Sequence, residues 1–133
     1  MKLTTKSEYS ILALLHLARD QGGGFVKIEE ICSKYGITKK YLELLLTILK
    51  QNHYIRTKRG IHGGYRLARP ASEISLAEII RLMDGPLAPT ESASVYFFSP
   101  TPLSAEERVV EVFRDIRDYA ANKLEAVKLS DLV

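Results

Sequence analysis

The stretch Lys58-Arg59-Gly60-Ile61-His62-Gly63-Gly64-Tyr65-Arg66-Leu67 decides how this chain is interpreted. Two short β-prone runs, residues 54–57 and 65–67, flank three glycines, and glycine accepts a positive φ without strain. This pattern predicts a β-hairpin. The hairpin contains no carboxylate, and its cationic side chains and histidine are Arg56, Lys58, Arg59, His62 and Arg66. Taken alone, it is equally consistent with a solvated surface turn and with contact to a phosphate backbone.

Charge is distributed unevenly along the 133 residues. Residues 1–70 contain thirteen Lys and Arg against five Asp and Glu, whereas residues 71–133 contain six against eleven. The basic part includes the hairpin, so we expect it to bind a polyanion.

The sequence also indicates where the protein works. No apolar run approaches the ~18 residues that a membrane span needs, and residues 1–5 do not resemble a secretory signal. The one cysteine, Cys32, excludes a disulfide within the chain and suits a reducing compartment. We therefore expect a cytoplasmic protein without a membrane partner.

A helix-turn-helix is predicted directly before the hairpin. A capping box at residues 5–8 opens a largely apolar helix, a second helix spans residues 27–35, and Gly36 ends it. Thr38 is a good N-cap for a third helix, whose leucines recur on one face. In this motif the start of the last helix enters the major groove. Here that start presents Thr38, Lys39, Lys40, Tyr41 and Glu43. Followed by a basic hairpin, the motif predicts a winged helix.

Several stretches resemble the Rrf2 family of bacterial transcription regulators. They are Lys2-Leu3-Thr4 with Tyr9, Gly36-Ile37, Tyr41-Leu42-Glu43, Arg59-Gly60-x-x-Gly63-Gly64-Tyr65-x-Leu67, and the closing Leu129-Ser130-Asp131-Leu132. The resemblance spans essentially the whole chain. It implies a dimeric DNA-binding regulator whose wing enters the minor groove, led by Arg59, while the helix at 38–43 reads the major groove. Leu44 stands where some members have a polar side chain, so the bases preferred need not be theirs.

The resemblance and the composition together give a set of expected DNA contacts. These residues are Lys2, Thr38, Lys39, Lys40, Tyr41, Glu43, Lys58, Arg59, Gly60, His62, Gly63, Gly64 and Arg66.

After the hairpin, a second capping box at residues 75–78 predicts a short helix that ends at Asp84. Residues 87–103 then show no helical pattern and contain the apolar run Val95-Tyr96-Phe97-Phe98. Cluster-sensing members of the family place three cysteines in the corresponding loop. This loop has none, and its serine hydroxyls are poor ligands for iron, whereas thiolates hold iron–sulfur clusters. We therefore expect no iron–sulfur cluster, no other metal and no cofactor.

The run at 95–98 has two interpretations. It either packs between the winged helix and the last helix, as aromatic runs usually do, or it forms a pocket or docking surface for an effector. The effector would be a small molecule or a protein.

The last helix is predicted from a capping box at residues 104–107 to about Lys128, or roughly 25 residues. Its apolar stripe is longer than a small winged helix can cover, so we expect it to meet its symmetry mate. The expected dimerisation residues are Val109, Val112, Phe113, Ile116, Ala120 and Leu124. The alternative is that the helix folds back along its own domain, in part through residues 129–133.

The sequence thus predicts a mainly α fold with a small β-hairpin: a winged helix-turn-helix plus a long C-terminal dimerisation helix. We divide it into a DNA-binding domain (1–70), a short helix with an effector-type loop (71–103), and a dimerisation helix with a tail (104–133). The predicted function is a dimeric, sequence-specific transcription regulator that represses. The alternative is a winged-helix interaction module acting through a partner enzyme or the loop 95–98. No enzyme is predicted, because paired carboxylates, a second phosphate loop and metal-ligand spacing among the three histidines are all missing.

Overall fold

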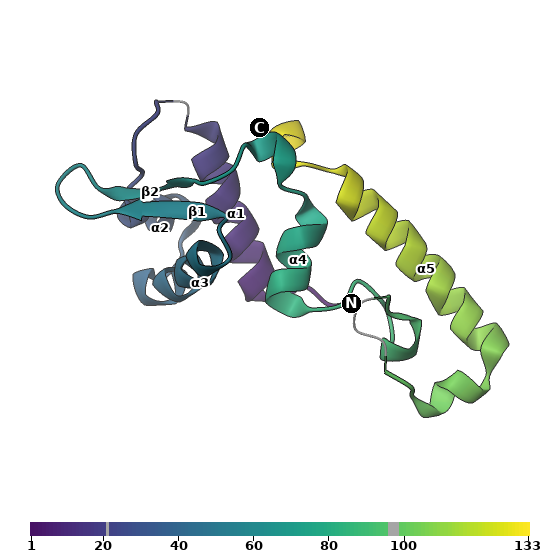
Figure 1. The fold of residues 1–133 in the computed structure, drawn as a ribbon. Coiled ribbons are helices and arrows are strands. Elements are labelled where there is room, and N and C mark those ends of the chain that lie inside the picture. The colour runs from purple at the N-terminus through teal and green to yellow at the C-terminus, as the bar shows by residue number, and fades with distance from the viewer. Residues whose placement is uncertain (21, 96–98) are drawn as a thin grey trace.

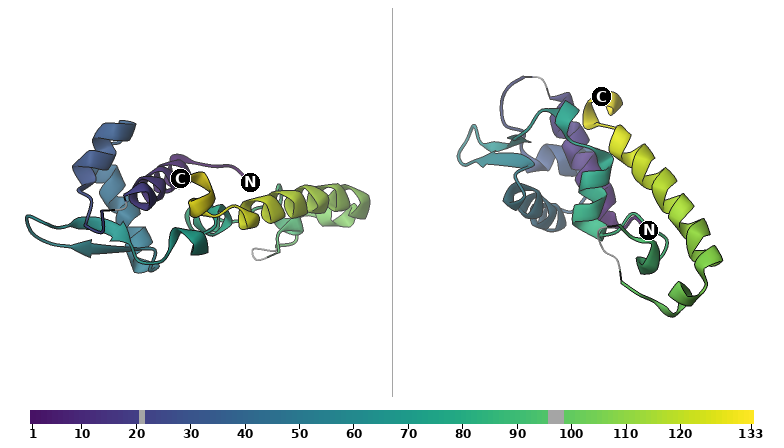
Figure 2. Two further views of the ribbon diagram at one scale, coloured as in Figure 1. Left: turned by 90° about the horizontal axis from the view of Figure 1, so that it is seen from above. Right: turned by 45° about the vertical axis from the view of Figure 1, so that its right-hand side comes forward.

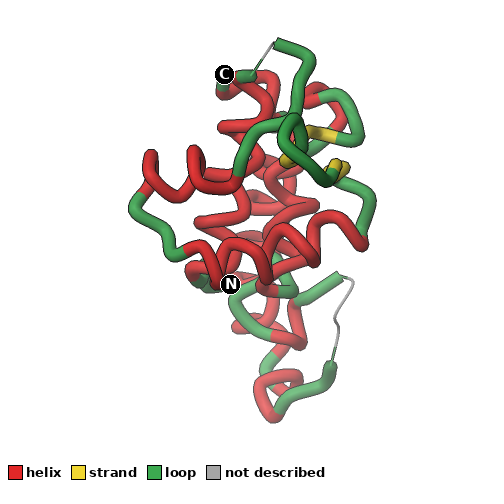
Figure 3. The backbone as a smooth tube through the Cα atoms, turned by 90° about the vertical axis from the view of Figure 1, so that its left-hand side faces the viewer, coloured by secondary structure: helices red, strands yellow, loops and turns green. Residues whose placement is uncertain are grey.

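The computed structural model describes residues 1–20, 22–95 and 99–133. Within them lie five α-helices and one two-stranded antiparallel sheet, and helices dominate the trace (Figure 3). The helices are α1 (Thr5–Arg19), α2 (Ile28–Tyr35), α3 (Lys39–Gln51), α4 (Leu76–Asp84) and α5 (Glu107–Ala126); the strands are β1 (Ile55–Lys58) and β2 (Gly64–Leu67). Short 3₁₀ turns are η1 (Ala71–Glu73), η2 (Glu91–Ala93), η3 (Pro102–Ala105) and η4 (Leu129–Leu132). The predicted order of helices and hairpin is confirmed.

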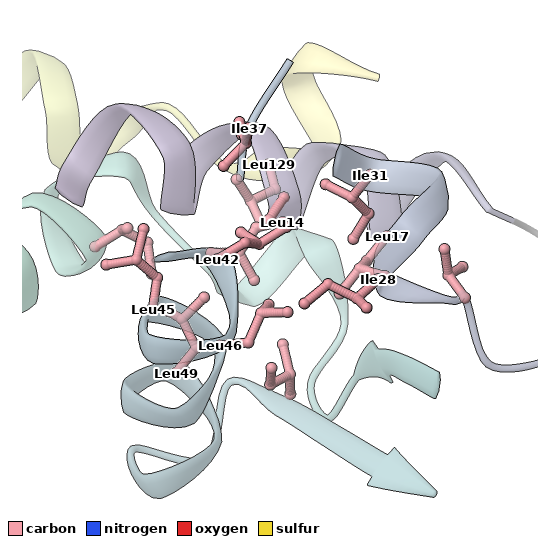
Figure 4. Close-up of a cluster of buried hydrophobic side chains, with 14 of the residues drawn as sticks. Leu14, Leu17, Ile28, Ile31, Ile37, Leu42, Leu45, Leu46, Leu49 and Leu129 are labelled. Atoms are coloured by element: carbon pink, nitrogen blue, oxygen red, sulfur yellow. The ribbon is translucent and has the colours of Figure 1, made fainter. Parts of the chain in front are cut away.

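The main hydrophobic core is built around α1 and α3. Leu42, Leu45 and Leu49 recur at helical spacing on one face of α3, and all three are fully buried together with Leu14 of α1. Figure 4 shows these side chains converging with those of α2. Leu129, from the C-terminal turn, packs into the same cluster (Figure 4). The tail therefore completes the core of the winged helix.

The hairpin pairs Ile55 with Leu67 at its base and Lys58 with Gly64 near its tip. Val26 forms an antiparallel bridge to Tyr65, with both N···O distances at 2.8 Å. The hairpin thus has a third, single-residue strand on its β2 side, and its tip projects beyond the helices (Figure 1).

The long helix α5 is held by α4. Ala121 and Leu124 pack against a second cluster formed by buried Ala77, Ile80 and Leu87. The hairpin and the N-terminal end of α5 lie at opposite ends of the molecule (Figures 1 and 2). A molecule bound at the hairpin would therefore lie far from the N-terminal end of α5.

Two of the three predicted capping boxes are wrong, and the third is confirmed. The N-cap of α1 is Thr4, not Thr5: the Thr4 hydroxyl accepts from the backbone N–H of Lys6 at 3.2 Å. Residue 104 lies inside η3, and α5 begins at Glu107 without a side-chain cap. At α4 the Ser75 hydroxyl accepts from the Glu78 N–H at 3.2 Å, and the Glu78 carboxylate accepts from the Ser75 N–H at 2.8 Å.

The last helix is also shorter than predicted, with 20 residues. It ends at Ala126 because the backbone that follows pairs with the segment before α4: the Leu76 N–H donates to Val127 and the Leu129 N–H donates to Ile74. The loop 87–103, predicted without helical structure, contains η2 and the first two residues of η3. Residues 96–98 lie outside the described residues, so both interpretations of the aromatic run stay predictions. Among the helices that the structure describes, none is long and apolar enough to cross a membrane.

Candidate nucleic-acid interface

The turn between α2 and α3 orients the start of α3. Gly36 takes a left-handed conformation, with φ 67° and ψ 35°, and its N–H donates to the carbonyl of Cys32 at 2.9 Å. Ile37, one residue on, is buried, whereas Thr38 begins an exposed run. Five side chains of the outward surface at the start and middle of α3 are exposed: Lys39, Lys40, Glu43, Leu44 and Thr47.

Tyr41 is less exposed than the other predicted contact residues at the start of α3, because it is half-buried. Its ring meets that of Tyr9 edge to face, with centroids 5.7 Å apart. Its hydroxyl lies 3.0 Å from the hydroxyl of Thr5. Tyr41 therefore fastens the start of α3 to the start of α1, which limits how far this end of α3 can tilt.

Lys39 pairs with Glu29 of α2, with 3.0 Å between the ammonium nitrogen and a carboxylate oxygen. The pKa of Glu29 is lowered by its own backbone N–H and by Lys39, and the hydrogen bond to Glu29 raises the pKa of Lys39. Lys39 therefore stays cationic at neutral pH. Both side chains are exposed, and exposed pairs contribute little to stability. The ammonium can therefore move to a phosphate at small cost.

Glycine is required at two positions near the hairpin tip. A Cβ on Gly63 would lie 2.1 Å from the carbonyl oxygen of Lys58. A Cβ on Gly64, whose φ is +143°, would lie 2.3 Å from the carbonyl oxygen of Val26. Both distances are far below contact, so a larger residue would force the strands apart. The tip itself is closed by the Gly63 N–H, which donates to the carbonyl of Gly60 at 3.0 Å.

Residues before α2 brace the hairpin, and sequence reasoning missed them. The Lys27 ammonium donates to the carbonyl of Gly60 at 3.0 Å. The ring of Phe25 lies beneath two cations, with its centroid 5.9 Å from the Lys58 nitrogen and 5.3 Å from the Arg66 guanidinium carbon. Cation–π contacts of this kind favour both charges. No local pattern marks Phe25 or Lys27, since their partners lie more than thirty residues away in the chain.

The cations of the hairpin are not equivalent. Arg66 is partly engaged, because it donates to the carbonyl of Gly23 at 3.3 Å in addition to its contact with Phe25. Arg59 and His62 are exposed and make no hydrogen bond or ion pair to any described residue. Ile61 between them is 85% exposed. The tip therefore presents free charge outward on a braced frame.

The outer face of the hairpin adds further positive charge. Arg56 lies directly opposite Arg66 across the two strands, and like charges in that position repel. Both residues and Arg69 line a hollow of about 420 Å³ between the hairpin and the end of α1. The electropositive surface thus continues from the tip toward the base.

Lys2 lies apart from both the start of α3 and the hairpin. It is exposed in the extended segment before α1, whose terminal amine donates to the carbonyl of Ala88 at 2.7 Å. The N terminus lies beside the end of α4, away from the hairpin tip (Figure 1). The structure therefore distributes the predicted DNA contacts over the start of α3, the hairpin and the N-terminal segment.

The predicted stripe of α5 divides into two faces. Val109, Val112 and Ile116 are 40%, 56% and 49% exposed, and Tyr119 continues this face at 76%. The other predicted members, Phe113, Ala120 and Leu124, are half-buried. Sequence reasoning missed Tyr119 on the exposed face.

The buried side of α5 is centred on Val110, which is 1% exposed and was also missed. A period of 3.6 residues separates Val110 from Val109 by about 100° around the helix. One apolar stripe in the sequence therefore forms two adjacent faces, of which one packs on its own chain.

Few donors suit a metal. Cys32 is half-buried on α2, and burial raises the pKa of its thiol. In the described part of the loop 87–103, Ser92 is 3% exposed and its hydroxyl lies 3.3 Å from the hydroxyls of Thr90 and Thr101. The described residues contain no group of three or more His, Cys, Asp or Glu side chains placed to hold a metal ion.

A helix-turn-helix whose second helix, α3, has an exposed outward face, followed by a braced cationic hairpin, defines a winged-helix DNA-binding protein. The family model described as "Rrf2: Iron-dependent Transcriptional regulator" matches residues 3–133. The chain therefore belongs to the Rrf2 family of helix-turn-helix transcription regulators, and the predicted resemblance is confirmed.

Individual relatives agree with this assignment. An HTH-type transcriptional regulator of Mycobacterium tuberculosis is 34% identical over 133 residues, which cover 99% of this chain and 81% of that protein. IscR of Photorhabdus laumondii is 31% identical over 135 residues, covering 100% of this chain and 79% of IscR. The structure of CymR, the global cysteine regulator of Bacillus subtilis, is similar with a TM-score of 0.77 and 26% identity, covering 99% of this chain and 95% of that one.

Proposed function

We propose that this regulator acts as a homodimer on a pseudo-palindromic operator, each subunit addressing one half-site. The observation that carries the proposal is the exposed start of α3 beside a glycine-fixed hairpin whose tip charges, Arg59 and His62, have no partner among the described residues. The start of α3 enters the major groove, and the tip enters the adjacent minor groove, where Arg59 leads.

The contacts fall into two kinds. Glu43 and Lys40 face base edges, because carboxylates accept from cytosine amino groups and lysine donates to guanine. The others contact the phosphate backbone, which positions the protein without reading sequence. These backbone contacts are Lys2, Thr38, Lys39, Tyr41, Lys58, Gly60, His62, Gly63, Gly64 and Arg66.

The dimer is proposed to form through α5. Val112 and Ile116 are about half exposed, and an apolar helix face of this kind is stabilised by burial against a second copy. The same proposed contact includes Val109 on the exposed face. It also includes three half-buried residues at the margin of that face: Phe113, Ala120 and Leu124. Half-sites on successive turns of the duplex would require the two copies of α3 in this dimer to lie about 34 Å apart. Occupation of such an operator across a promoter excludes RNA polymerase, so we propose repression in the cytoplasm.

Sensing is proposed not to use an iron–sulfur cluster, although the family model is described as iron-dependent. Such clusters are held by thiolates, and the chain has one cysteine, which lies on α2. Two copies in a dimer would supply two thiols, each packed beside its own core. The effector is proposed to be a small molecule or a protein that acts on the loop 87–103. Protein purified without oxygen should show no sulfide-to-iron absorption, and stoichiometric iron would contradict this.

Titration of DNA tests the proposal. The protein's own upstream region, titrated at two salt concentrations, should bind tightly and lose affinity steeply as salt rises, because lysine and arginine release counterions. Arg59→Ala should cost ~1–3 kcal/mol and relax sequence preference, whereas Lys39→Ala should weaken all sequences alike. Unchanged operator affinity in Arg59→Ala would exclude the proposed role of the wing. Absence of salt-sensitive binding with any ligand would favour the interaction module acting through a protein partner.

A further inference from the structure

One stripe of α3 is directed outward. Lys40, Glu43, Leu44 and Thr47 follow one another at steps of three, one and three residues, which places them on one face of a helix. The same four residues line a shallow hollow of about 540 Å³ together with Thr38 and Tyr41. In a helix-turn-helix this face of the second helix approaches the base edges.

Leu44 is out of place on this face if the face meets only water and phosphates. It is 55% exposed, while Leu42, Leu45 and the remaining leucines of α3 are fully buried. All of α3 is described, and Leu44 is its one exposed large apolar residue. A scattered surface leucine needs no explanation, but this one lies between Lys40 and Thr47 in the stripe that faces DNA.

Thr47 reinforces the apolar character. Its hydroxyl donates to the carbonyl of Glu43 at 2.8 Å, one turn back along the helix. The hydroxyl proton is therefore used inside the helix and is not offered to a base. What Thr47 adds to the stripe beside Leu44 is its methyl group.

We infer that Leu44, assisted by the methyl group of Thr47, reads the C5-methyl groups of thymines in the major groove. The inference rests on the proposed function and specifies the bases that it reads. Thymine alone among the four bases presents a methyl group there, and apolar side chains are its partners. Leu44 and Thr47 are separated by about 4.5 Å along the helix axis, close to the ~3.4 Å between successive bases. The two side chains can therefore meet thymines in neighbouring base pairs.

Glu43 adds a preference for a second base beside the thymine. Its exposed carboxylate lies on the same stripe. Cytosine and adenine alone present amino donors in the major groove, and carboxylates pair with the amino group of cytosine. A half-site is therefore expected to contain a thymine step next to a cytosine. A polar residue in place of Leu44 would lose the preference for thymine and keep the one for cytosine.

The experiment removes single methyl groups from DNA. Binding sites are first selected from a randomised duplex library, and each thymine of the enriched site is then replaced by deoxyuridine, which pairs identically. The wild-type protein should lose roughly fourfold in affinity at one or two thymines per half-site, as expected for one buried methyl group. Leu44→Ala should bind the thymine and deoxyuridine duplexes equally at the position that Leu44 contacts.

Lys40→Ala is the matched control on the same stripe. It should lower affinity for the thymine and deoxyuridine forms of the selected site by the same factor, and so retain the response to deoxyuridine. Leu44→Ala should fold normally, since alanine favours the helix as well as leucine does and the side chain leaves no cavity; thermal melting checks this. A wild-type protein indifferent to deoxyuridine at every thymine, or a Leu44→Ala protein with the full wild-type response, would overturn the inference while the proposed function stands. Failure to enrich any sequence, with no salt-sensitive binding, would remove the proposed function and this inference with it.

Discussion

Helices α3 and α5 are both amphipathic, yet they differ in how much of the apolar face is buried within the chain. Four leucines of α3, Leu42, Leu45, Leu46 and Leu49, are fully buried against the rest of their own chain. Among the 20 residues of α5, Val110 alone is buried. Val112 and Ile116 remain about half exposed.

The difference separates two roles that sequence periodicity makes look alike. The apolar face of α3 is buried within the chain, so its outward face stays available for the proposed contact with DNA. The apolar face of α5 is buried only in part, by α4, and its remaining exposed face is the one proposed to contact a second copy of the chain. A change on the buried face of α3 should therefore act on folding, and a change on the exposed face of α5 should act on assembly.

The largest expected effect is that of Leu46→Ala. Leu46 is fully buried in the main core, and removal of a buried leucine leaves a cavity that costs roughly 2–5 kcal/mol. The free energy of unfolding, measured in urea, should fall by this amount. The fall should be the same at low and high protein concentration, because the core lies within one chain. A loss that vanishes at high concentration would show that α3 also depends on the partner.

Ile116→Glu is the counterpart on α5, with an effect expected to be somewhat smaller. A carboxylate placed in an apolar contact loses hydration without gaining a partner, which should cost roughly 1–3 kcal/mol of association for each substituted side chain. Sedimentation should show a monomer with unchanged helical content, and operator affinity should fall with it. Asn122→Glu adds the same charge to an exposed position away from the stripe and should leave the dimer intact. If both variants stay dimeric, α5 is not the interface.

Gly64→Ala tests whether the hairpin must stay fixed relative to α3. The new methyl group would collide with the carbonyl of Val26, and φ is +143°, so strain of roughly 1–3 kcal/mol is expected. The strain can be relieved by releasing the bridge to Val26, which would lower operator affinity more than melting temperature. Gly24→Ala is the control, since its φ is unexceptional and a Cβ there meets nothing within 4 Å. Equal affinity in both variants would mean that the position of the hairpin is not critical.

Elements governed by local chemistry could be predicted from the sequence. The hairpin follows from three glycines between β-prone runs, and the helix-turn-helix follows from the helical spacing of apolar residues on either side of Gly36. The capping box at Ser75 is correct because both its partners lie within one turn. The turn at Gly36 needs only a residue that tolerates the left-handed conformation.

Features governed by distant contacts could not be predicted. The box at residue 5 failed because a carboxylate from α4 selects Thr4 instead. The brace from Lys27 to the hairpin joins residues 33 positions apart. The single stripe predicted for α5 became two faces, since the sequence records apolar spacing and not which neighbour covers it. The sequence alone marks Leu44 as a departure from the family pattern, but its exposure follows from how α3 packs on the rest of the chain.

Asp84 joins α4 to α1, because it is the last residue of α4 and its carboxylate binds the start of α1. Its carboxylate accepts from the backbone N–H of Thr4 at 2.8 Å, from the Thr4 hydroxyl at 2.5 Å and from the Ser7 hydroxyl at 2.6 Å. Burial opposes ionisation, yet these hydrogen bonds outweigh it and hold the pKa of Asp84 below its ordinary value. The proximity of the carboxylate to the positive end of α1 also favours the charged form.

Asp84→Asn should therefore lower stability in a manner that depends on pH. A lowered pKa in the folded state contributes stability that is present above the unfolded-state pKa and is lost as pH falls through the folded-state value. At neutral pH the variant should be about 1–2 kcal/mol less stable than wild type, allowing for partial exposure. As pH falls through the lowered folded-state pKa of Asp84, the two proteins should approach each other in stability, since the wild-type carboxyl is then protonated as well. Urea midpoints at neutral and at acidic pH measure this, and a difference that grows on acidification would contradict the stabilising role of the Asp84 charge.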